Sequence, residues 1–223
     1  MMTGISRLGI KHISGSAAFQ DAFAVSHETL SRLKVYADLL KRWQKTINLV
    51  APSTLDDVWH RHFADSAQLW HLASPGDIHW LDLGSGAGFP GLVLAIMASE
   101  TGGTRHTLIE SDTRKAAFLR EVARETGTAV EIVADRIELP ATAAKVGEVN
   151  CVTARALAPL VRLLPLVAPF FGQASVGLFL KGRDVTAELE DAALSWAFQP
   201  ELVASVTDRD GRILKLAQLH QKR

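Results

Sequence analysis

The chain has 223 residues, of which 48% are hydrophobic and 22% are charged, a composition typical of a globular protein rather than a disordered one. Lys plus Arg and Asp plus Glu number 24 each, so the formal net charge is zero, which argues against a general nucleic-acid coat protein but allows a local basic patch. No apolar run reaches the roughly 20 residues of a membrane span, and the N-terminus lacks a secretory signal pattern. The single cysteine, Cys151, excludes an internal disulfide, so we expect a cytoplasmic protein without membrane association.

The first third of the chain has helical periodicity. Ser26 is a suitable N-cap for a helix over 26–47, whose apolar residues fall on one face, and a second amphipathic helix is predicted over 54–72. We expect the first dozen residues to be loose or a short arm. Together these segments predict an N-terminal helical extension, residues 1–75, packed on a core formed by residues 76–223.

Five basic residues with one opposing acid, Asp38, lie in the first predicted helix. The basic residues are Arg32, Lys34, Lys41, Arg42 and Lys45. They are either an ordinary solvated helix face, partly balanced by Lys34–Asp38 and Asp38–Arg42 pairs, or a basic patch for an anionic partner.

From residue 78 onward, short apolar runs alternate with helical patterns. Strands are predicted at 78–83, 105–110, 130–134, 149–154 and 175–181, with helices at 90–100, 113–126, 158–170 and 185–196 and a short turn after the third strand. Two final runs, 198–206 and 212–219, are predicted to form a terminal antiparallel hairpin. Because strand–helix alternation favours parallel pairing, we expect an α/β fold with a mostly parallel sheet and helices on both faces.

The first predicted strand runs into a glycine-rich turn, Leu81-Asp-Leu-Gly84-Ser-Gly86-Ala-Gly88-Phe89-Pro-Gly91. Glycine tolerates positive φ and lets the backbone approach a ligand closely. An acid two residues before a G-x-G-x-G run resembles motif I of the class I (Rossmann-like) methyltransferases that use S-adenosyl-L-methionine (AdoMet). Asp82 would then lie near the positive sulfonium.

Glu110 ends the second predicted strand, where a carboxylate can accept both ribose hydroxyls of such a cofactor. Three alternatives stay open. Glu110 is also compatible with a helix-capping or surface acid, and the glycines with a structural turn. The spacing from Gly86 to Gly91 also matches G-x-G-x-x-G, so a nicotinamide-dependent oxidoreductase remains a weaker interpretation.

The residues at the end of the fourth predicted strand constrain the methyl acceptor. Thr153-Ala-Arg155-Ala-Leu stands where many enzymes that methylate exocyclic amines have an (N/D)-P-P-(Y/F) element. Cys151, the one candidate nucleophile for a pyrimidine carbon, opens an apolar strand and is interpreted as a small core residue. A ring nitrogen, a ribose hydroxyl or a small molecule remain as acceptors. Guanine N7 has its own lone pair, so it suits a site without an obvious general base.

Several motifs in the same order resemble the RsmG (GidB) family of bacterial 16S rRNA guanine-N7 methyltransferases. They are Asn48-Leu49, Trp59-His-Arg61-His62-Phe-Ala-Asp65-Ser66, the glycine turn, Glu110-Ser-Asp-Thr-Arg-Lys115-Ala-Ala-Phe118-Leu119, Ala134-Asp-Arg136-Ile-Glu138, Ala154-Arg155-Ala156 and Leu180-Lys181-Gly182. They span roughly residues 30–220. One departure is Ala154, where the family commonly has serine, so no role is assigned to a hydroxyl there.

The resemblance implies AdoMet as cofactor and 16S rRNA, free or in the small ribosomal subunit, as partner. The implied cofactor-binding residues are Asp82, Gly84, Gly86, Gly88, Phe89, Glu110, Ile137, Glu138 and Arg155. Arg155 would also be the catalytic residue, where base and methyl donor meet. The candidate RNA contacts are Arg61, His62, Arg136, Lys181 and Arg183.

Other interpretations of these residues stay open. Arg155 could be half of an ion pair, His62 a packed core histidine, and Lys181 and Arg183 parts of a polar loop. His60 and His62 do not share a helix face and lack a third ligand, so we expect no metal. We expect a monomer. The alternative function is a small-molecule AdoMet methyltransferase whose N-terminal helices form a substrate lid.

Overall fold

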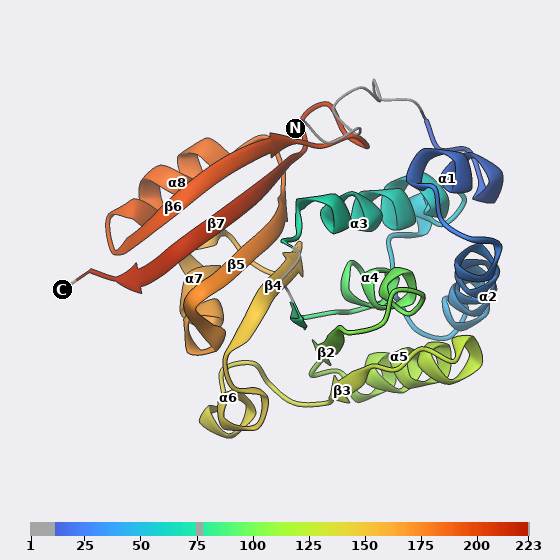
Figure 1. The fold of residues 1–223 in the computed structure, drawn as a ribbon, viewed down its shortest axis with the longest axis horizontal. Helices are drawn as coiled ribbons and strands as arrows, with labels where there is room; N and C mark the ends of the chain where they lie inside the picture. Colours follow the sequence, from blue (N-terminus) through green and yellow to red (C-terminus); the bar gives the residue numbers. More distant parts are fainter. Residues whose placement is uncertain (1–11, 75–77, 223) are drawn as a thin grey trace.

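The computed structural model describes residues 12–74 and 78–222 and shows a seven-stranded sheet of order β3-β2-β1-β4-β5-β7-β6 (Figure 1). Strands β1 to β5 are parallel, and β7 pairs antiparallel with β5 and β6. The strands are β1 (His79–Leu83), β2 (Arg105–Ile109), β3 (Glu131–Val133), β4 (Val149–Arg155), β5 (Phe171–Lys181), β6 (Trp196–Ala204) and β7 (Arg212–Gln221). The predicted mostly parallel sheet with a terminal hairpin is confirmed. The expected N-terminal arm, apart from residue 12, and the boundary at 75/76 lie outside the described residues.

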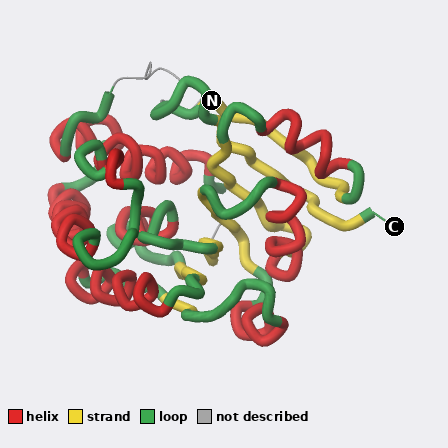
Figure 2. Tube along the Cα trace, turned by 180° about the vertical axis from the view of Figure 1, so that it is seen from behind, coloured by secondary structure: helices red, strands yellow, loops and turns green. Residues whose placement is uncertain are grey.

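Helices cover both faces of the sheet (Figures 1 and 2). The helical elements are α1 (Ser16–Phe23), α2 (His27–Trp43), η2 (Pro52–Thr54), η3 (Trp59–Ala64), α3 (Asp65–Ala67), η4 (Gln68–Leu72), α4 (Gly91–Ala98), α5 (Thr113–Thr126), α6 (Pro140–Val146), α7 (Leu160–Val167), η5 (Ala168–Phe170) and α8 (Val185–Ala193). Alternate strand residues divide between the faces: Leu81 and Phe179 pack with α6, α7 and α8, whereas Trp80 and Leu178 pack with α4 and η4. Cys151 is buried on the second face, as its interpretation as a core residue predicts.

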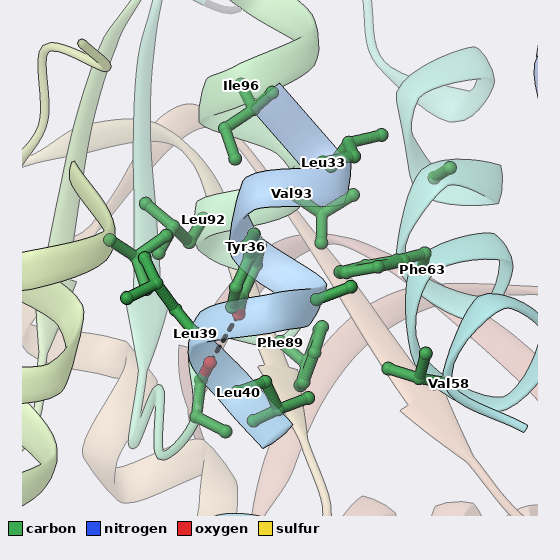
Figure 3. Packing of buried hydrophobic residues seen from close by; sticks show 14 of the residues in the cluster. Leu33, Tyr36, Leu39, Leu40, Val58, Phe63, Phe89, Leu92, Val93 and Ile96 are labelled. Atoms are coloured by element: carbon green, nitrogen blue, oxygen red, sulfur yellow. Dashed lines mark hydrogen bonds between the residues drawn. The ribbon is translucent and has the colours of Figure 1, made fainter. Parts of the chain in front are cut away.

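Helix α2 contributes buried side chains to the hydrophobic core of the sheet domain. Figure 3 shows Leu33, Tyr36 and Leu40 of α2 facing Phe89 and Val93, at and after the glycine turn. All five side chains are buried, so α2 shares one hydrophobic cluster with α4 and α5. Burying apolar surface is the dominant favourable term in folding. This shared cluster therefore couples the stability of helix α2 to that of the sheet-covering helices α4 and α5.

The predicted helix over 26–47 begins where expected but ends earlier. Ser26 accepts hydrogen bonds from the amides of Glu28 and Thr29, both at 3.1 Å, which confirms the N-cap. The helix ends at Trp43 instead of 47. The Gln44 side-chain oxygen accepts hydrogen bonds from the amides of Leu49 and Val50 at 3.0 Å. These bonds stabilise a reversal of the chain where the helix was expected to continue.

The prediction of one continuous helix over 54–72 was wrong. The segment is a short 3₁₀ turn (η2), a π-helix (η3), one turn of α-helix (α3) and a further 3₁₀ stretch (η4). In η3, His60 and the three residues from His62 to Ala64 are all buried, and the side chains on more than one face contact the core. Tertiary contacts therefore override the local helical pattern here.

Three smaller differences concern short or terminal elements. Helices α1 and α6 were not predicted as helices, because each has only two buried residues and so a weak apolar pattern. Helix α8 ends at Ala193 and β6 begins at Trp196, whereas the helix was expected to continue to 196 and the strand to begin at 198. Such shifts are typical where propensity alone sets a boundary.

Replacing Gly91 by alanine tests the close packing of α4 on β1. A Cβ at Gly91 would lie 2.5 Å from Cβ and 2.8 Å from Oδ2 of buried Asp82. Gly91 has no positive φ, so the cost is steric rather than conformational. We expect Gly91→Ala to lower the free energy of unfolding by about 1–3 kcal/mol in urea denaturation. Gly182→Ala is the control, because a Cβ there meets nothing within 4 Å. Equal stability of the two variants would contradict this packing.

Candidate functional site

The glycine turn between β1 and α4 needs glycine for its backbone conformation. Gly84, Gly86 and Gly88 have φ values of 63°, 57° and 95°, in the region that L side chains rarely adopt. A Cβ at Gly84 would lie 2.6 Å from Cδ1 of Leu157, and one at Gly88 would lie 2.5 Å from the Tyr36 hydroxyl. Neighbouring side chains thus fix the turn from both sides. Its backbone stays partly exposed at Gly84 and Gly86, whereas Gly88 is buried.

Tyr36 holds this turn from the N-terminal side. Its hydroxyl donates to the carbonyl oxygen of Ala87, and its ring stacks on Phe89 at 5.3 Å and 13°. Burial raises the pKa of the Tyr36 hydroxyl well above its ordinary value, so it remains a donor. Sequence reasoning missed this residue, because nothing in the apolar face of a helix marks one ring as a partner of a distant turn.

Glu110 lies directly after β2 and has 7% exposure. Its Oε2 accepts from the Gly86 amide at 2.7 Å, and its Oε1 accepts from the Asp112 amide at 2.8 Å. Glu110 therefore braces the glycine turn, a role that the sequence did not predict. An ionised carboxylate offers about four acceptor positions, so these two bonds leave capacity for ribose hydroxyls.

Asp82 is buried between β1 and the start of α4. Its Oδ1 accepts from the Thr153 hydroxyl at 2.7 Å, and its Oδ2 has no hydrogen bond of good geometry to any described residue. Burial raises the pKa of Asp82 to about 6 despite the Thr153 bond. The carboxylate lies against Gly91 beneath the turn and does not contact a ligand above it. It can therefore stabilise a bound cation only by electrostatic attraction through the intervening protein.

Ile137 and Glu138 follow β3, with Ile137 half-buried and Glu138 exposed. Because β1, β2 and β3 are parallel neighbours, this segment, Glu110 and the glycine turn all lie at the carboxyl edge of the sheet. The arrangement gives an AdoMet-sized molecule a bare backbone at β1, a carboxylate at β2 and an apolar side chain after β3.

Arg155, the last residue of β4, is held by groups from η3 and α3. Its Nη1 donates to the carbonyl oxygen of Arg61 at 3.1 Å and lies 3.4 Å from Oδ2 of Asp65. Its Nη2 lies 2.9 Å from Nδ1 of His62. The guanidinium carbon also lies 5.1 Å from the centre of the Phe89 ring, in cation–π contact. The ion pair expected as an alternative for Arg155 is therefore present, and it lies beside the glycine turn.

His62 is neutral, with a fixed tautomer. A guanidinium cannot accept a hydrogen bond, so Nδ1 of His62 must accept from Arg155. Nε2 therefore carries the proton and donates to the Thr54 hydroxyl at 2.8 Å. Burial, followed by the charges of Arg155 and Arg61, lowers the pKa of His62 to about 3. The ring stacks on Phe89 at 4.8 Å and 19°, so the interpretation of His62 as a packed histidine describes what the structure shows.

An open pocket of about 730 Å³ lies beyond Arg155, at the carboxyl ends of β4 and β5. Its charged lining residues are Arg61, Asp65, Arg155, Arg162, Lys181, Arg183, Glu188, Asp208, Asp210 and Arg212. This volume accommodates a nucleotide or a similar polar molecule. The pocket has six cationic and four acidic side chains on its walls, which matches an anionic substrate better than an apolar one.

The RNA-contact candidates occupy different positions around this pocket. Lys181 is turned into the wall, where its ammonium donates to Glu188 at 2.7 Å and to the Ala158 carbonyl at 3.0 Å. Arg61 and Arg183 lie at the rim in exposed pairs with Asp208 at 3.5 Å and Asp210 at 3.3 Å. Exposed pairs of this kind are weak and can exchange partners.

Arg136, the fifth RNA-contact candidate, is exposed after β3 and does not line the pocket. The structure therefore brings four of the five candidates together and leaves Arg136 outside.

A polar network that the sequence did not predict ties α3 to the loop between β6 and β7. Asp65 Oδ1 accepts from the Thr207 hydroxyl at 2.8 Å and from the Gln68 side-chain amide at 3.0 Å. Oε1 of Gln68 accepts from the Val206 amide at 2.9 Å, and Gln68 also bonds Ser205. The contacts of Asp65 and Gln68 with the loop join residues about 140 positions apart, so no local sequence pattern could have predicted them.

The described residues contain neither a cluster of metal-binding side chains nor a helix that could span a membrane. Within residues 12–74 and 78–222, no group of three or more His, Cys, Asp or Glu side chains is arranged to hold a metal ion. None of the helices in the same part of the chain is long and apolar enough to span a membrane.

The His62 environment predicts a pH dependence of stability. The pKa of His62 is about 3 in the folded state, against an ordinary histidine value of 6.5, so the unfolded chain binds more protons between these values. Stability from His62 is complete above about pH 6.5 and is lost as the pH falls toward about 3. We expect the free energy of unfolding of His62→Gln to depend less on pH between 7 and 5, by up to about 1.4 kcal/mol per pH unit.

Asp82 acts in the opposite direction in part of this window, because its raised pKa makes the folded state the better proton acceptor between about 4 and 6. Both proteins contain Asp82, so its contribution cancels in the comparison. Identical pH profiles for wild type and His62→Gln would contradict a buried neutral histidine.

Comparisons with known proteins agree with this geometry. Residues 29–215 match the family model GidB, described as rRNA small subunit methyltransferase G. A protein of Parvibaculum lavamentivorans named ribosomal RNA small subunit methyltransferase G is 48% identical, over 95% of this chain and 93% of the relative. One of the same name from Rhodospirillum centenum is 53% identical, over 90% of this chain and 89% of the relative.

Solved structures share the fold at low identity. An MtNAS variant in complex with S-adenosylmethionine superposes with a TM-score of 0.56 and 14% identity, covering 96% of this chain and 88% of that one. A methyltransferase from Geobacter sulfurreducens gives a TM-score of 0.56 and 15% identity, covering 84% and 88%. The predicted class I methyltransferase fold is thus confirmed. On the strength of the family match and the curated relatives, the chain belongs to the GidB family, rRNA small subunit methyltransferase G.

Proposed function

We propose that this chain transfers a methyl group from AdoMet to N7 of a guanine in 16S rRNA. The observation that carries the proposal is the position of Arg155, between the glycine turn and the charged pocket at the end of β4. The cofactor half of the site lies on one side of this arginine, and a pocket of nucleotide size lies on the other. Family membership favours rRNA of the small subunit as the acceptor.

The residues present fit AdoMet. Gly84 and Gly86 leave the backbone partly exposed, Gly88 allows the close approach of Tyr36, and Glu110 retains acceptor capacity for ribose. The remaining proposed cofactor residues are Phe89, Ile137, Glu138 and Arg155, with Asp82 beneath the turn. When bound, AdoMet supplies an electrophilic methyl group on its sulfonium. Because guanine N7 has a lone pair and no proton, the chain need not supply a general base.

The contribution of the chain to the reaction is then chiefly positioning, which can supply much of an enzymatic rate enhancement. Arg155 would hold the target base by donating to its O6 atom, which leaves the N7 lone pair free to attack the methyl group. Phe89 and His62 keep the guanidinium in place. Lys181 would shape the wall, and Arg61, Arg136 and Arg183 would contact RNA phosphates.

We prefer rRNA to a small-molecule acceptor, because a small-molecule site was expected to be a closed apolar pocket and charged residues line the observed one.

We further propose that residues 1–75 form an extension on a core of residues 76–223. The chain would act as a monomer in the cytoplasm without a metal. Either free 16S rRNA or the assembled small subunit would serve as its substrate.

The direct test is methyl transfer from radiolabelled AdoMet to small subunits or 16S rRNA taken from cells that lack the endogenous modification, followed by digestion to nucleosides. We expect label in 7-methylguanosine, and its loss with Arg155→Ala. Label in another nucleoside, or none in RNA from a protein that binds AdoMet, would contradict the proposal.

Glu110→Ala tests the cofactor half of the site. Removing a charged acceptor that contacts ribose costs about 1.5–3 kcal/mol, so we expect AdoMet to bind about 10–100-fold more weakly in calorimetry. The brace on Gly86 is lost as well, which adds a smaller loss of stability. Glu121→Ala, a half-buried acid on α5 paired with Arg124, is the matched control. Unchanged AdoMet affinity of Glu110→Ala would remove Glu110 from the ribose site.

A further inference from the structure

The C-terminal end of helix α2 extends past the glycine turn at the carboxyl edge of the sheet. Near its N-terminus, Arg32 donates to the Ser99 hydroxyl at 2.7 Å, at the far end of α4. Its middle residue Tyr36 already reaches the glycine turn, where α4 begins. Helix α2 therefore runs antiparallel to α4 and toward the carboxyl edge. At 1.5 Å per residue, Lys41 lies about 8 Å further along the helix axis than Tyr36.

The end of α2 that passes the turn carries exposed cations. Lys41, Arg42 and Lys45 are all exposed. Among the described residues, no ion pair includes any of these three. The Asp38–Arg42 and Lys34–Asp38 pairs expected for a balanced face are not formed. By contrast, Arg32 at the other end of the helix pairs with Glu28 at 2.5 Å.

Helix α5 adds to this cluster. The Trp43 ring of α2 contacts Phe118 of α5, with ring centres 5.6 Å apart, so the end of α2 lies beside the first turns of α5. Lys115 is half-buried in those turns and is likewise outside every described ion pair. Like charges without counter-ions repel one another, so such a cluster is stabilised by binding an anion.

The observations point to one kind of partner. We propose that Lys41, Arg42, Lys45 and Lys115 bind the sugar–phosphate backbone of the 16S rRNA outside the target nucleotide. This inference rests on the proposed function and deepens it, because it assigns the end of helix α2 and the turn after it to substrate binding. The cations lie on the cofactor side of the glycine turn, whereas the pocket lies beyond Arg155. An RNA that fills the pocket and reaches α2 must therefore cross the carboxyl edge of the sheet.

The test is the triple variant Lys41→Gln, Arg42→Gln, Lys45→Gln in the methyl-transfer assay with small subunits or 16S rRNA. Its matched control is Lys34→Gln, Arg120→Gln, Lys145→Gln, which removes the same charge from exposed positions away from the carboxyl edge. We expect KM for RNA to rise by about ten-fold in the test variant, or about 1.4 kcal/mol, with kcat and AdoMet affinity unchanged. The slope of log KM against log salt should become shallower by about 2–3, at 0.7–0.9 per lost phosphate contact.

Three outcomes separate the alternatives. A KM and salt slope equal to those of the control would overturn the inference and leave α2 with a solvated face. A loss of kcat at unchanged KM would also overturn it, because a remote phosphate contact does not act on the chemical step. In both cases wild type still forms 7-methylguanosine, whereas failure of the wild type to methylate RNA would refute the proposed function itself.

Discussion

The candidate site depends on how a largely buried arginine is accommodated. The Arg155 side chain is only 19% exposed, and removing a guanidinium from water is costly unless anions and acceptors replace the solvent. Asp65, His62 and the Arg61 carbonyl provide that replacement, and Phe89 covers one face of the guanidinium. The three polar partners come from the segment before the sheet, so the core alone does not complete its own site.

This arrangement explains the irregular helical segment η3–α3. Arg61, His62 and Asp65 each present a group to Arg155, and Asp65 also holds Thr207 in the loop between β6 and β7. Asp65 thus links three segments that are distant in the sequence: η3–α3, the end of β4 and the loop between β6 and β7. Because partners in one network do not contribute independently, substitutions among these residues are expected to be non-additive.

Sequence patterns predicted the parts of the protein that local rules determine. The strand–helix alternation, the Ser26 cap and the glycine turn follow from periodicity, capping and positive φ, and the structure contains all three. The π-helix and the inward Lys181 could not be predicted, because distant partners decide them. Arg155 was placed at the site by family resemblance, but its dependence on Asp65 is visible only in three dimensions.

The most direct test of this account is Asp65→Asn, assayed both for AdoMet affinity and for methyl transfer to 16S rRNA. Asp65 touches Arg155 but not the glycine turn, so it acts as a positioning residue. The account predicts a smaller loss of AdoMet affinity than Glu110→Ala causes, together with transfer at saturating AdoMet that is at least about ten-fold slower, a rise of about 1.4 kcal/mol in the barrier. Wild-type transfer in Asp65→Asn would show that Arg155 does not need this anion, and would contradict the account.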